Sequence, residues 1–165
     1  DMLHLALSND TSLQLDAREC RKPGTSYSVD TLRELRHRWG EDTALDFCVG
    51  TDAFLQMNTW HCWEQLVCLC NIVVVSRPGW HLPDELGPLE AWRDRFTQDS
   101  DTLLRQPAGA VLFVTLTPVD VSATRIRRLV SEGRSARYLL PEAAWQYIQQ
   151  HRLYRTDTQE ISPNP

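Results

Sequence analysis

Short apolar runs alternate with amphipathic segments along most of this chain. Residues 45–49 and 71–75 are mostly apolar, and residues 110–115 form a third such run. β-Branched side chains dominate the second run, as expected for a parallel strand that is buried on both faces. These three runs predict strands of a mainly parallel sheet.

Segments with helical periodicity separate the apolar runs. We predict helices at 2–6, 29–39, 53–57, 64–69, 88–96 and 122–132, and a last helix that begins at Ser135 or Pro141 and ends near Gln150. Because strands and helices alternate, the predicted fold class is α/β. Residues 1–154 are expected to form one domain, and residues 155–165 a flexible tail.

The segment before the first long helix carries weaker signals. Residues 12–18 alternate leucines with polar neighbours, which predicts another strand. Ser26 or Ser28 is expected to cap the helix at 29–39. Gly40 is expected to end that helix.

Residues 80–109 differ in composition from the rest of the chain. They are polar and proline-rich, so we expect a surface excursion with one helix in it. Trp39, Trp92 and Trp145 occupy positions of amphipathic helices and are expected to pack against the core.

The break after the first apolar run is the most informative turn in the chain. Gly50-Thr51-Asp52 leads from the strand into the helix at 53–57, and parallel sheets bind ligands at such strand ends. Gly50 lets a ligand approach the backbone, Asp52 can accept hydrogen bonds from ribose hydroxyls, and Trp60 offers a flat face to an aromatic ring. A plain turn followed by an amphipathic helix with a core tryptophan would explain the same pattern.

Arginines gather at the start of the helix that follows Ser122, where the helix dipole disfavours cations. Arg125, Arg127 and Arg128 stand in its first turns, close in sequence to the hydroxyls of Ser122 and Thr124. Free amides, hydroxyls and guanidinium groups together can hold a phosphate, so the pattern indicates an anion site. The alternative is a capped surface helix with solvated arginines.

Two further residues are candidates for binding anions. Arg77 directly follows the strand at 71–75, although an ordinary surface arginine before a Pro-Gly turn is an equal alternative. Ser28 could direct its backbone amide and a helix N-terminus toward a small carboxylate, and simple capping explains it equally well.

The composition argues against several classes of function. The 165 residues carry a net charge of −5 with a pI near 5.5, so no basic field is available for nucleic acid. No apolar run approaches the roughly 20 residues needed to span a bilayer, no signal peptide is visible, and a cytoplasmic location is expected. The five cysteines show no disulfide or zinc spacing, so no protein-bound metal is predicted.

Several of these segments, taken together, resemble a known family. SYSVDTLRELR at 26–36, VGTDAFLQMNTWHCWEQL at 49–66 and VSATRIRRLVSEGRSARYLLPEAAWQYIQQHRLY at 121–154 are similar to bacterial nicotinate-mononucleotide adenylyltransferases, in the same order. IVVVSRPGW at 72–80 fits between them. The resemblance implies a Rossmann-like nucleotidyltransferase fold, in which helices cover both faces of a mainly parallel sheet.

The resemblance also implies a reaction. ATP and nicotinate mononucleotide would give nicotinate adenine dinucleotide and pyrophosphate, a step of NAD biosynthesis. The phosphate oxygen of the mononucleotide would attack the α-phosphorus in line, with Mg²⁺ accompanying ATP and no covalent enzyme intermediate. Catalysis would then consist of positioning and charge stabilisation.

Roles for the candidate residues follow from the same resemblance. Trp60 would stack on the nicotinate ring, and backbone amides near Ser28 and His61 would hold its carboxylate. Gly50 and Asp52 would meet a nucleotide ribose. The residues expected to bind ATP are Gly50, Asp52, Arg77, Ser122, Thr124 and Arg127.

The sequence departs from the family in one important respect. Members begin with a strand followed by G-G-[TS]-F-D-P-x-H-x-G-H, whose histidines bind the triphosphate. That motif does not occur here, so the first βα unit is expected to be missing and the catalytic residues are unknown. Thr25 and Ser28 also replace a common proline and threonine.

Two alternatives to this reaction stay open at this point. The chain could be a non-catalytic nucleotide-binding domain of the same family, or it could transfer adenylyl to another acceptor such as nicotinamide mononucleotide. Both a monomer and a homodimer are compatible with the sequence.

Overall fold

A computed structural model describes residues 1–76, 79–117 and 121–155, and it divides the chain into two compact units. The first, called here the helical unit, comprises Asp1–Ala17 and Val119–Pro165. The second, the sheet unit, comprises Arg18–Pro118. The expected single domain over residues 1–154 stays a prediction, and each unit is described by itself.

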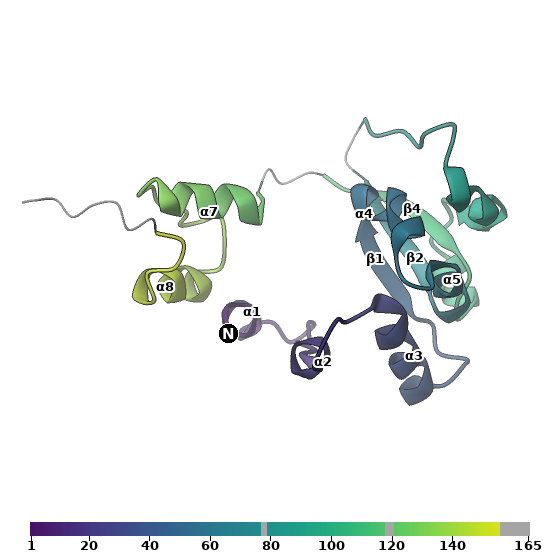
Figure 1. Cartoon of the computed structure of the whole chain (residues 1–165), viewed down its shortest axis with the longest axis horizontal. Helices are drawn as coiled ribbons and strands as arrows, with labels where there is room; N and C mark the ends of the chain where they lie inside the picture. The colour runs from purple at the N-terminus through teal and green to yellow at the C-terminus, as the bar shows by residue number, and fades with distance from the viewer. Residues whose placement is uncertain (77–78, 118–120, 156–165) are drawn as a thin grey trace, which may run out of the picture. The chain divides into compact units, whose positions relative to one another are not determined.

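The sheet unit contains a four-stranded parallel sheet (Figure 1). Its strands are β1 (Asp46–Gly50), β2 (Asn71–Ser76), β3 (Phe96–Thr97) and β4 (Val111–Thr115), in the spatial order β1-β2-β4-β3. All pairs are parallel, with Val49 opposite Val74 and Val74 opposite Phe113. The three strands that the apolar runs predicted are therefore confirmed, as is the α/β class.

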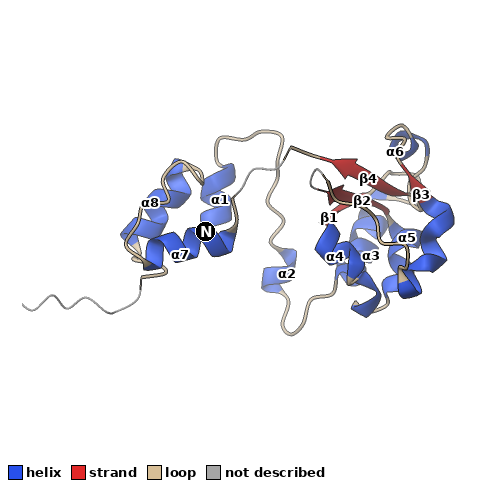
Figure 2. Cartoon of the chain, turned by 90° about the horizontal axis from the view of Figure 1, so that it is seen from above, coloured by secondary structure: helices blue, strands red, loops and turns tan. Residues whose placement is uncertain are grey.

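Short helices connect these strands. They are α2 (Arg18–Arg21), α3 (Ser28–Trp39), α4 (Thr51–Leu55), α5 (Leu66–Leu69) and α6 (Thr102–Arg105), with 3₁₀ turns η1 (Met57–Thr59), η2 (Trp63–Gln65) and η3 (Gly87–Arg95). Figure 2 shows α3, α4 and α5 together on one side of the sheet. The helices predicted at 53–57 and 64–69 are present as shorter α and 3₁₀ pieces.

The core of the sheet unit lies between the sheet and these helices. Ile72 and Val74 of β2 and Val111 of β4 are fully buried in it, and Phe54 and Leu66 face them from α4 and α5. Because side chains alternate along a strand, every second residue of β2 enters this layer. The β-branched pattern of residues 71–75 follows from burial in the middle of a parallel sheet.

A buried asparagine ties the starts of the strands together. Asn71 is completely buried, and its Nδ2 donates to Asp46 Oδ1 at 2.9 Å and to the Gln106 carbonyl at 3.2 Å. Its Oδ1 accepts from the Ala110 amide at 3.0 Å. Every polar group of this side chain thus has a partner, which removes the penalty for burying it.

Arg36 of α3 is also buried, with 4% of its surface exposed. Its guanidinium donates to backbone carbonyls of the turn after α3, of the end of α5 and of the loop before β4, namely those of Gly40, Glu41, Thr43, Leu69 and Pro107. One side chain therefore gives hydrogen-bond partners to several carbonyls at helix ends and in loops, where the backbone itself leaves them unpaired.

The two ends of α3 test the expectations about its caps. The helix begins at Ser28 with Tyr27 as N-cap, and no side chain caps it, so the predicted capping by Ser26 or Ser28 is wrong. The Ser26 hydroxyl donates instead to the Glu19 carbonyl at 3.3 Å, which removes it from the helix start. Gly40 ends the helix with φ of 85°, as predicted.

The strand predicted at 12–18 is wrong. The carboxylate of Asp10 accepts from the amides of Ser12 and Leu13, which forms a turn, and the following residues up to α2 have no regular structure. Leu13 is 59% exposed. Because none of the described strands pairs with this segment, its alternating leucines have no sheet on which to pack.

Residues 80–109 contribute more to the core than a surface excursion would. Leu86, Leu89 and Trp92 are buried, and β3 adds a short edge strand beside β4. The predicted helix is the 3₁₀ segment η3. Trp92 packs as expected, with its ring centroid 4.9 Å from that of Trp63.

The helical unit consists of α1 (Met2–Leu7), α7 (Ala123–Ser131) and α8 (Glu142–Gln150). A small core of Leu129, Val130, Ala136 and Ile148 holds it together, with the partly buried Trp145 against it as predicted. The Tyr147 hydroxyl donates to the Asp1 carboxylate at 3.0 Å, which links α8 to the start of α1. Of the two predicted starts for the last helix, Pro141 is the one observed.

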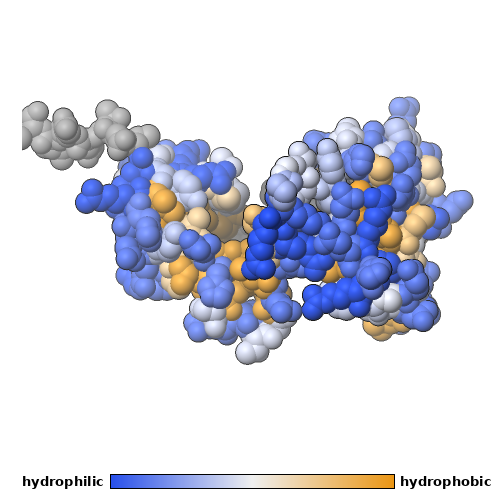
Figure 3. All heavy atoms as spheres, turned by 60° about the horizontal axis from the view of Figure 1, so that its bottom comes forward, coloured by the Kyte–Doolittle hydropathy of each residue, from blue (hydrophilic) through white to orange (hydrophobic). Residues whose placement is uncertain are grey.

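The face seen in Figure 3 is mostly hydrophilic with separate apolar patches. Trp39 is 49% exposed, so the expectation that it packs against the core is wrong. It is the last residue of α3, where the helix face no longer meets the sheet layer. No helix in the described part of the chain has the length and apolar character that crossing a membrane requires.

Candidate functional site

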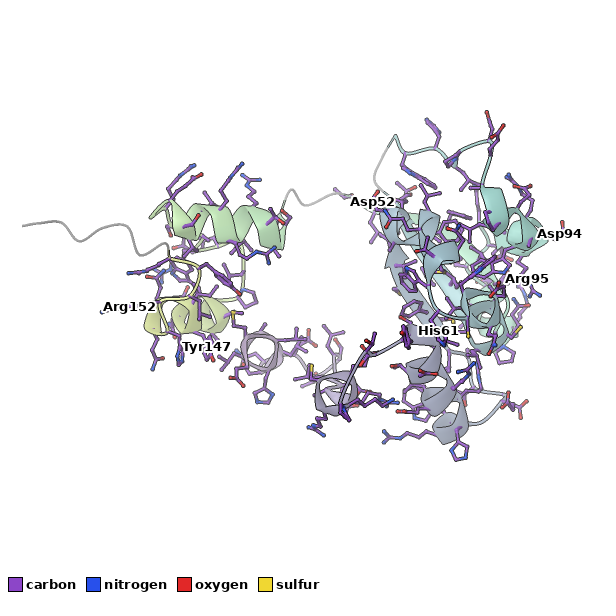
Figure 4. The ribbon with its side chains drawn as sticks, in the orientation of Figure 1. Asp52, His61, Asp94, Arg95, Tyr147 and Arg152 are labelled. Carbon is purple, nitrogen blue, oxygen red and sulfur yellow. The ribbon has the colours of Figure 1, made fainter. Side chains whose placement is uncertain are left out.

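Gly50 and Asp52 lie where β1 turns into α4. Gly50 ends the strand, and a Cβ built on it would meet no atom within 4 Å, so the space beside the strand end is open. Its φ of −76° is accessible to any residue, so the backbone conformation does not require glycine here. What glycine contributes is the open space left by the missing side chain. Asp52 is exposed in the first turn of α4 (Figure 4). Its carboxylate favours the positive end of that helix.

Trp60 follows η1 and is half-buried. Its ring packs against that of Phe47 of β1 in a T-shaped arrangement, with centroids 6.2 Å apart and planes at 72°. This contact fixes the indole against the core while part of the side chain stays accessible. The stacking of Trp60 on an aromatic ligand stays a prediction.

His61 lies against the start of α3 (Figure 4). Its ring is 4.4 Å from the ring of Tyr27, the residue before Ser28, and its Nε2 is 3.4 Å from Cys62 Sγ. Cys62 has φ of 49°, and this left-handed residue turns the chain between His61 and η2. The fold therefore brings the segments around Ser28 and His61 side by side, as a shared carboxylate site requires.

The contact between Tyr27 and His61 was not predicted from the sequence. It joins the two segments that were predicted to share a ligand, although no role was assigned to the Tyr27 ring. The position of Tyr27 between Ser26 and Ser28, inside a segment already assigned to the site, was the sequence feature that could have indicated a role for it. The first amides of α3 lie next to it, and such amides have no partner within a helix.

The other predicted cluster lies in the helical unit, at the start of α7. Ser122 is the N-cap and its hydroxyl accepts from the Arg125 amide at 3.2 Å, which confirms the predicted cap. Arg127 Nη2 donates to Thr124 Oγ1 at 3.4 Å. The first turn of α7 contains no acidic residue, so its cations are not neutralised there by a carboxylate of that turn.

One predicted site residue is outside the structure that is described. Arg77 falls in the gap between residues 76 and 79, directly after β2. Its role in binding anions stays a prediction.

A separate cavity of about 790 Å³ lies in the sheet unit, at the carboxyl ends of β2 and β4. It is called here the β4-edge cavity and is lined by Ser76, Trp80, His81, Leu82, Phe96, Thr97, Gln98, Ser100, Leu112, Phe113, Val114 and Thr115. None of the predicted site residues that the structure describes is among them. The cavity and the motif residues therefore occupy different places in the described structure.

Metal ligands and perturbed ionisable groups are scarce in the described residues. No group of three or more His, Cys, Asp and Glu side chains there could hold a metal ion. Burial raises the pKa of the Cys70 thiol to about 12, and its Sγ donates to the Leu66 carbonyl at 3.2 Å. Cys70 is therefore a structural thiol and does not serve as a metal ligand or nucleophile.

Two comparisons of the sequence concern bacterial relatives. The chain is 44% identical over 155 residues to a probable nicotinate-nucleotide adenylyltransferase of Hahella chejuensis. It is 42% identical over 156 residues to a protein of the same description from a Marinomonas species. The matches cover 93% and 94% of this chain and 70% of each relative.

The comparison of structures agrees on the fold. A Plasmodium falciparum nicotinic acid mononucleotide adenylyltransferase, complexed with NaAD, superposes with a TM-score of 0.59 at 12% identity, covering 93% of this chain and 71% of that one. The same enzyme complexed with APC gives 0.56 at 13% identity. No family model matches the sequence.

Proposed function

The chain belongs to the nicotinate-nucleotide adenylyltransferase family, a family of nucleotidyltransferases in NAD biosynthesis, and we propose that its motif residues bind ATP and nicotinate mononucleotide. The reaction of the family converts ATP and nicotinate mononucleotide into nicotinate adenine dinucleotide and pyrophosphate. The observation that carries the proposal is the 44% identity over 93% of the chain.

Nicotinate mononucleotide is assigned to the segments that Tyr27 joins. Trp60 would stack on the nicotinate ring, for which its half-buried position against Phe47 leaves one side accessible. Backbone amides near Ser28 and His61 would donate to the carboxylate. Two or more amide donors favour the acid over the neutral amide, because an ionised acceptor forms the stronger hydrogen bonds.

By the family's motifs, a nucleotide ribose is assigned to the strand end of the sheet unit, and phosphate oxygens are assigned separately to the cationic helix start of the helical unit. Gly50 offers clearance beside β1, and the exposed Asp52 would accept hydrogen bonds from a ribose. Ser122, Thr124 and Arg127 would hold phosphate oxygens, together with Arg77. The support is the combination of guanidinium and hydroxyl groups at a helix N-terminus whose first turn contains no acidic residue.

Mg²⁺ would accompany ATP rather than occupy a protein cage. In such sites Mg²⁺ binds through substrate phosphates and one or two carboxylates. When bound, the ion would neutralise phosphate charge. The chain's own residues would bind and align the substrates, so that the phosphate of the mononucleotide faces the α-phosphorus in line.

A second candidate rests on the absent histidine motif. The family's histidines that bind the triphosphate have no counterpart in these 165 residues. The chain could then bind nucleotides without catalysing the transfer. In either case we expect a cytoplasmic protein, as a monomer or a homodimer.

Pyrophosphate release and substrate binding, measured on the same preparation, test both candidates. We expect calorimetric binding of nicotinate mononucleotide, lost in Trp60→Ala and retained in Trp39→Ala, whose tryptophan is exposed at the far end of α3. Turnover with the acid but not with nicotinamide mononucleotide supports the enzyme. Binding without turnover supports the non-catalytic candidate, and the absence of both refutes the site assignment.

A further inference from the structure

We propose that Tyr27 is a positioning residue for the choice between the acid and the amide form of the mononucleotide. Through its ring contact with His61 it sets the separation of the two backbone amides that would hold the nicotinate carboxylate. This role rests on the proposed function, because it concerns the carboxylate assigned to the amides near Ser28 and His61. It adds a side chain that acts on the ligand only through the placement of these donors.

The amides of Ser28 and His61 are both available to a ligand. Within the described part of the chain, neither of them donates a hydrogen bond. Tyr27 is the N-cap of α3 and no side chain caps this helix, so the Ser28 amide is one of the first-turn donors that a helix cannot pair. The two donors come from segments distant in sequence, and they can share one carboxylate only if a contact fixes their separation.

The ring contact lies directly at these two donors. The rings of Tyr27 and His61 have centroids 4.4 Å apart and planes at 35°, a separation at which aromatic rings attract each other. Tyr27 immediately precedes Ser28, and His61 carries the second amide itself. The imidazole has a further contact, since its Nε2 is 3.4 Å from Cys62 Sγ. The ring pair therefore acts as a spacer between the two amides.

The contact is exposed, which separates its role from that of a core contact. Tyr27 is 41% exposed, and His61 is exposed as well. A second link joins α3 to the same segment further along the helix, because Arg33 Nη2 donates to Gln65 Oε1. Loss of the ring contact would therefore leave the two segments attached and would free the amides to move relative to each other.

The separation of two donors affects the acid and the amide differently. An ionised carboxylate accepts from both amides, and hydrogen bonds to a charged acceptor are the stronger ones. The carboxamide of nicotinamide has one acceptor oxygen, and its NH₂ group would face the second donor without a partner. Well-placed amides thus favour the acid, while displaced amides lose the acid's advantage and change little for the amide.

Calorimetric dissociation constants of nicotinate mononucleotide and nicotinamide mononucleotide test the role of Tyr27. Tyr27→Ala keeps the backbone amides and removes the ring, so it should lower the ratio of acid to amide affinity at least about tenfold, the worth of one hydrogen bond to a charged group. Tyr27→Phe keeps the ring and should keep the ratio. Gln65→Ala is the matched control, which removes only the other link and should leave the ratio unchanged. Equal weakening of both ligands in Tyr27→Ala indicates a merely structural role and overturns the proposal.

Variants of His61 test whether the two rings act as a pair. His61→Ala retains its own amide and should lower the ratio as Tyr27→Ala does, and the double variant should lose no more than either single one. His61→Phe should keep the ratio, because the ring and not the charge of the imidazole is the spacer. Additive losses, or a loss in His61→Phe as large as in His61→Ala, contradict the paired contact.

Failure of this role can be told apart from failure of the proposed function. If the unchanged chain does not bind nicotinate mononucleotide, the proposed function is refuted and the positioning role with it. If it binds with a preference for the acid that Tyr27→Ala leaves intact, only the positioning role is refuted. Urea unfolding of Tyr27→Ala should give the midpoint of the unchanged chain, since an exposed side chain contributes little to stability.

Discussion

Replacing Arg36 by methionine should destabilise the sheet unit strongly, although Arg36 is not one of the candidate site residues. Arg36 is only 4% exposed, and its guanidinium donates to the Leu69 carbonyl at 2.5 and 3.1 Å and to the Pro107 carbonyl at 3.0 Å. Further bonds reach Gly40 at 3.0 Å and Thr43 at 2.5 Å. Arg36→Met keeps the apolar stem and removes every donor.

The magnitude follows from the acceptors that lose their partner. Each buried carbonyl left unsatisfied costs about 1–3 kcal/mol, and methionine removes the desolvation cost of the buried charge, which offsets part of the loss. Water can reach the outer carbonyls of the Gly40 turn, so we expect a net loss of about 3 kcal/mol. The loss of stability in Arg36→Lys should lie between that of Arg36→Met and zero, since one ammonium cannot reach carbonyls on several sides.

Urea unfolding followed by tryptophan fluorescence provides the assay, because Trp60, Trp63 and Trp92 all report on the sheet unit. Arg33→Met is the matched control on the same helix. Arg33 is exposed and its nearest acid is Asp30 at 2.7 Å, so its loss should cost less than about 1 kcal/mol. If Arg36→Met also lowers the free energy of unfolding by less than about 1 kcal/mol, the hydrogen bonds to these carbonyls do not stabilise the fold and the reasoning is refuted.

Three further predictions concern a buried thiol, a core tryptophan and a helix cap. Burial raises the Cys70 pKa from 9.0 to about 12, so its contribution to stability is complete below pH 9 and is lost as pH rises from 9 toward 12. Urea midpoints of Cys70→Ala should therefore fall less steeply than those of the unchanged chain above pH 9, and parallel curves would contradict this. Trp92→Ala should cost about 3–5 kcal/mol in the same assay, and Trp39→Ala less than about 0.5 kcal/mol, because only the first side chain is buried. Equal losses of stability in Trp92→Ala and Trp39→Ala would show that burial of the side chain does not determine the loss. Ser122→Ala should lower the stability of the helical unit by about 1 kcal/mol through loss of the N-cap, read from the thermal transition of helical circular dichroism, and an unchanged transition would argue against the cap.

The α/β class and the order of its central strands could be predicted from the sequence because the signals were local. Residues 72–75 are β-branched and lie in β2, which has a neighbouring strand on each side. Gly50 and Asp52 mark the end of β1 in any parallel sheet, and the cap at Ser122 needs only the residues that follow it. Family motifs are likewise local strings, and the relatives confirmed the family that they indicated.

What failed depended on partners distant in sequence. Residues 12–18 alternate like a strand, but alternation does not supply a neighbouring strand, and no described strand pairs there. Trp39 and Trp92 look alike in their helices, yet only Trp92 meets the core. An amphipathic pattern states which side chains could be buried, whereas the packing of the other elements decides which are.

The sequence by itself determined the kinds of element, their order and the family of this protein. Tertiary structure alone decided that Tyr27 meets His61, that Arg36 gathers carbonyls from three segments, and that β3 ends early enough to leave the β4-edge cavity. The physical reason is the range of the interactions. Propensity, capping and turn chemistry act between residues a few positions apart, while burial, stacking and cavities arise only where distant segments are packed together.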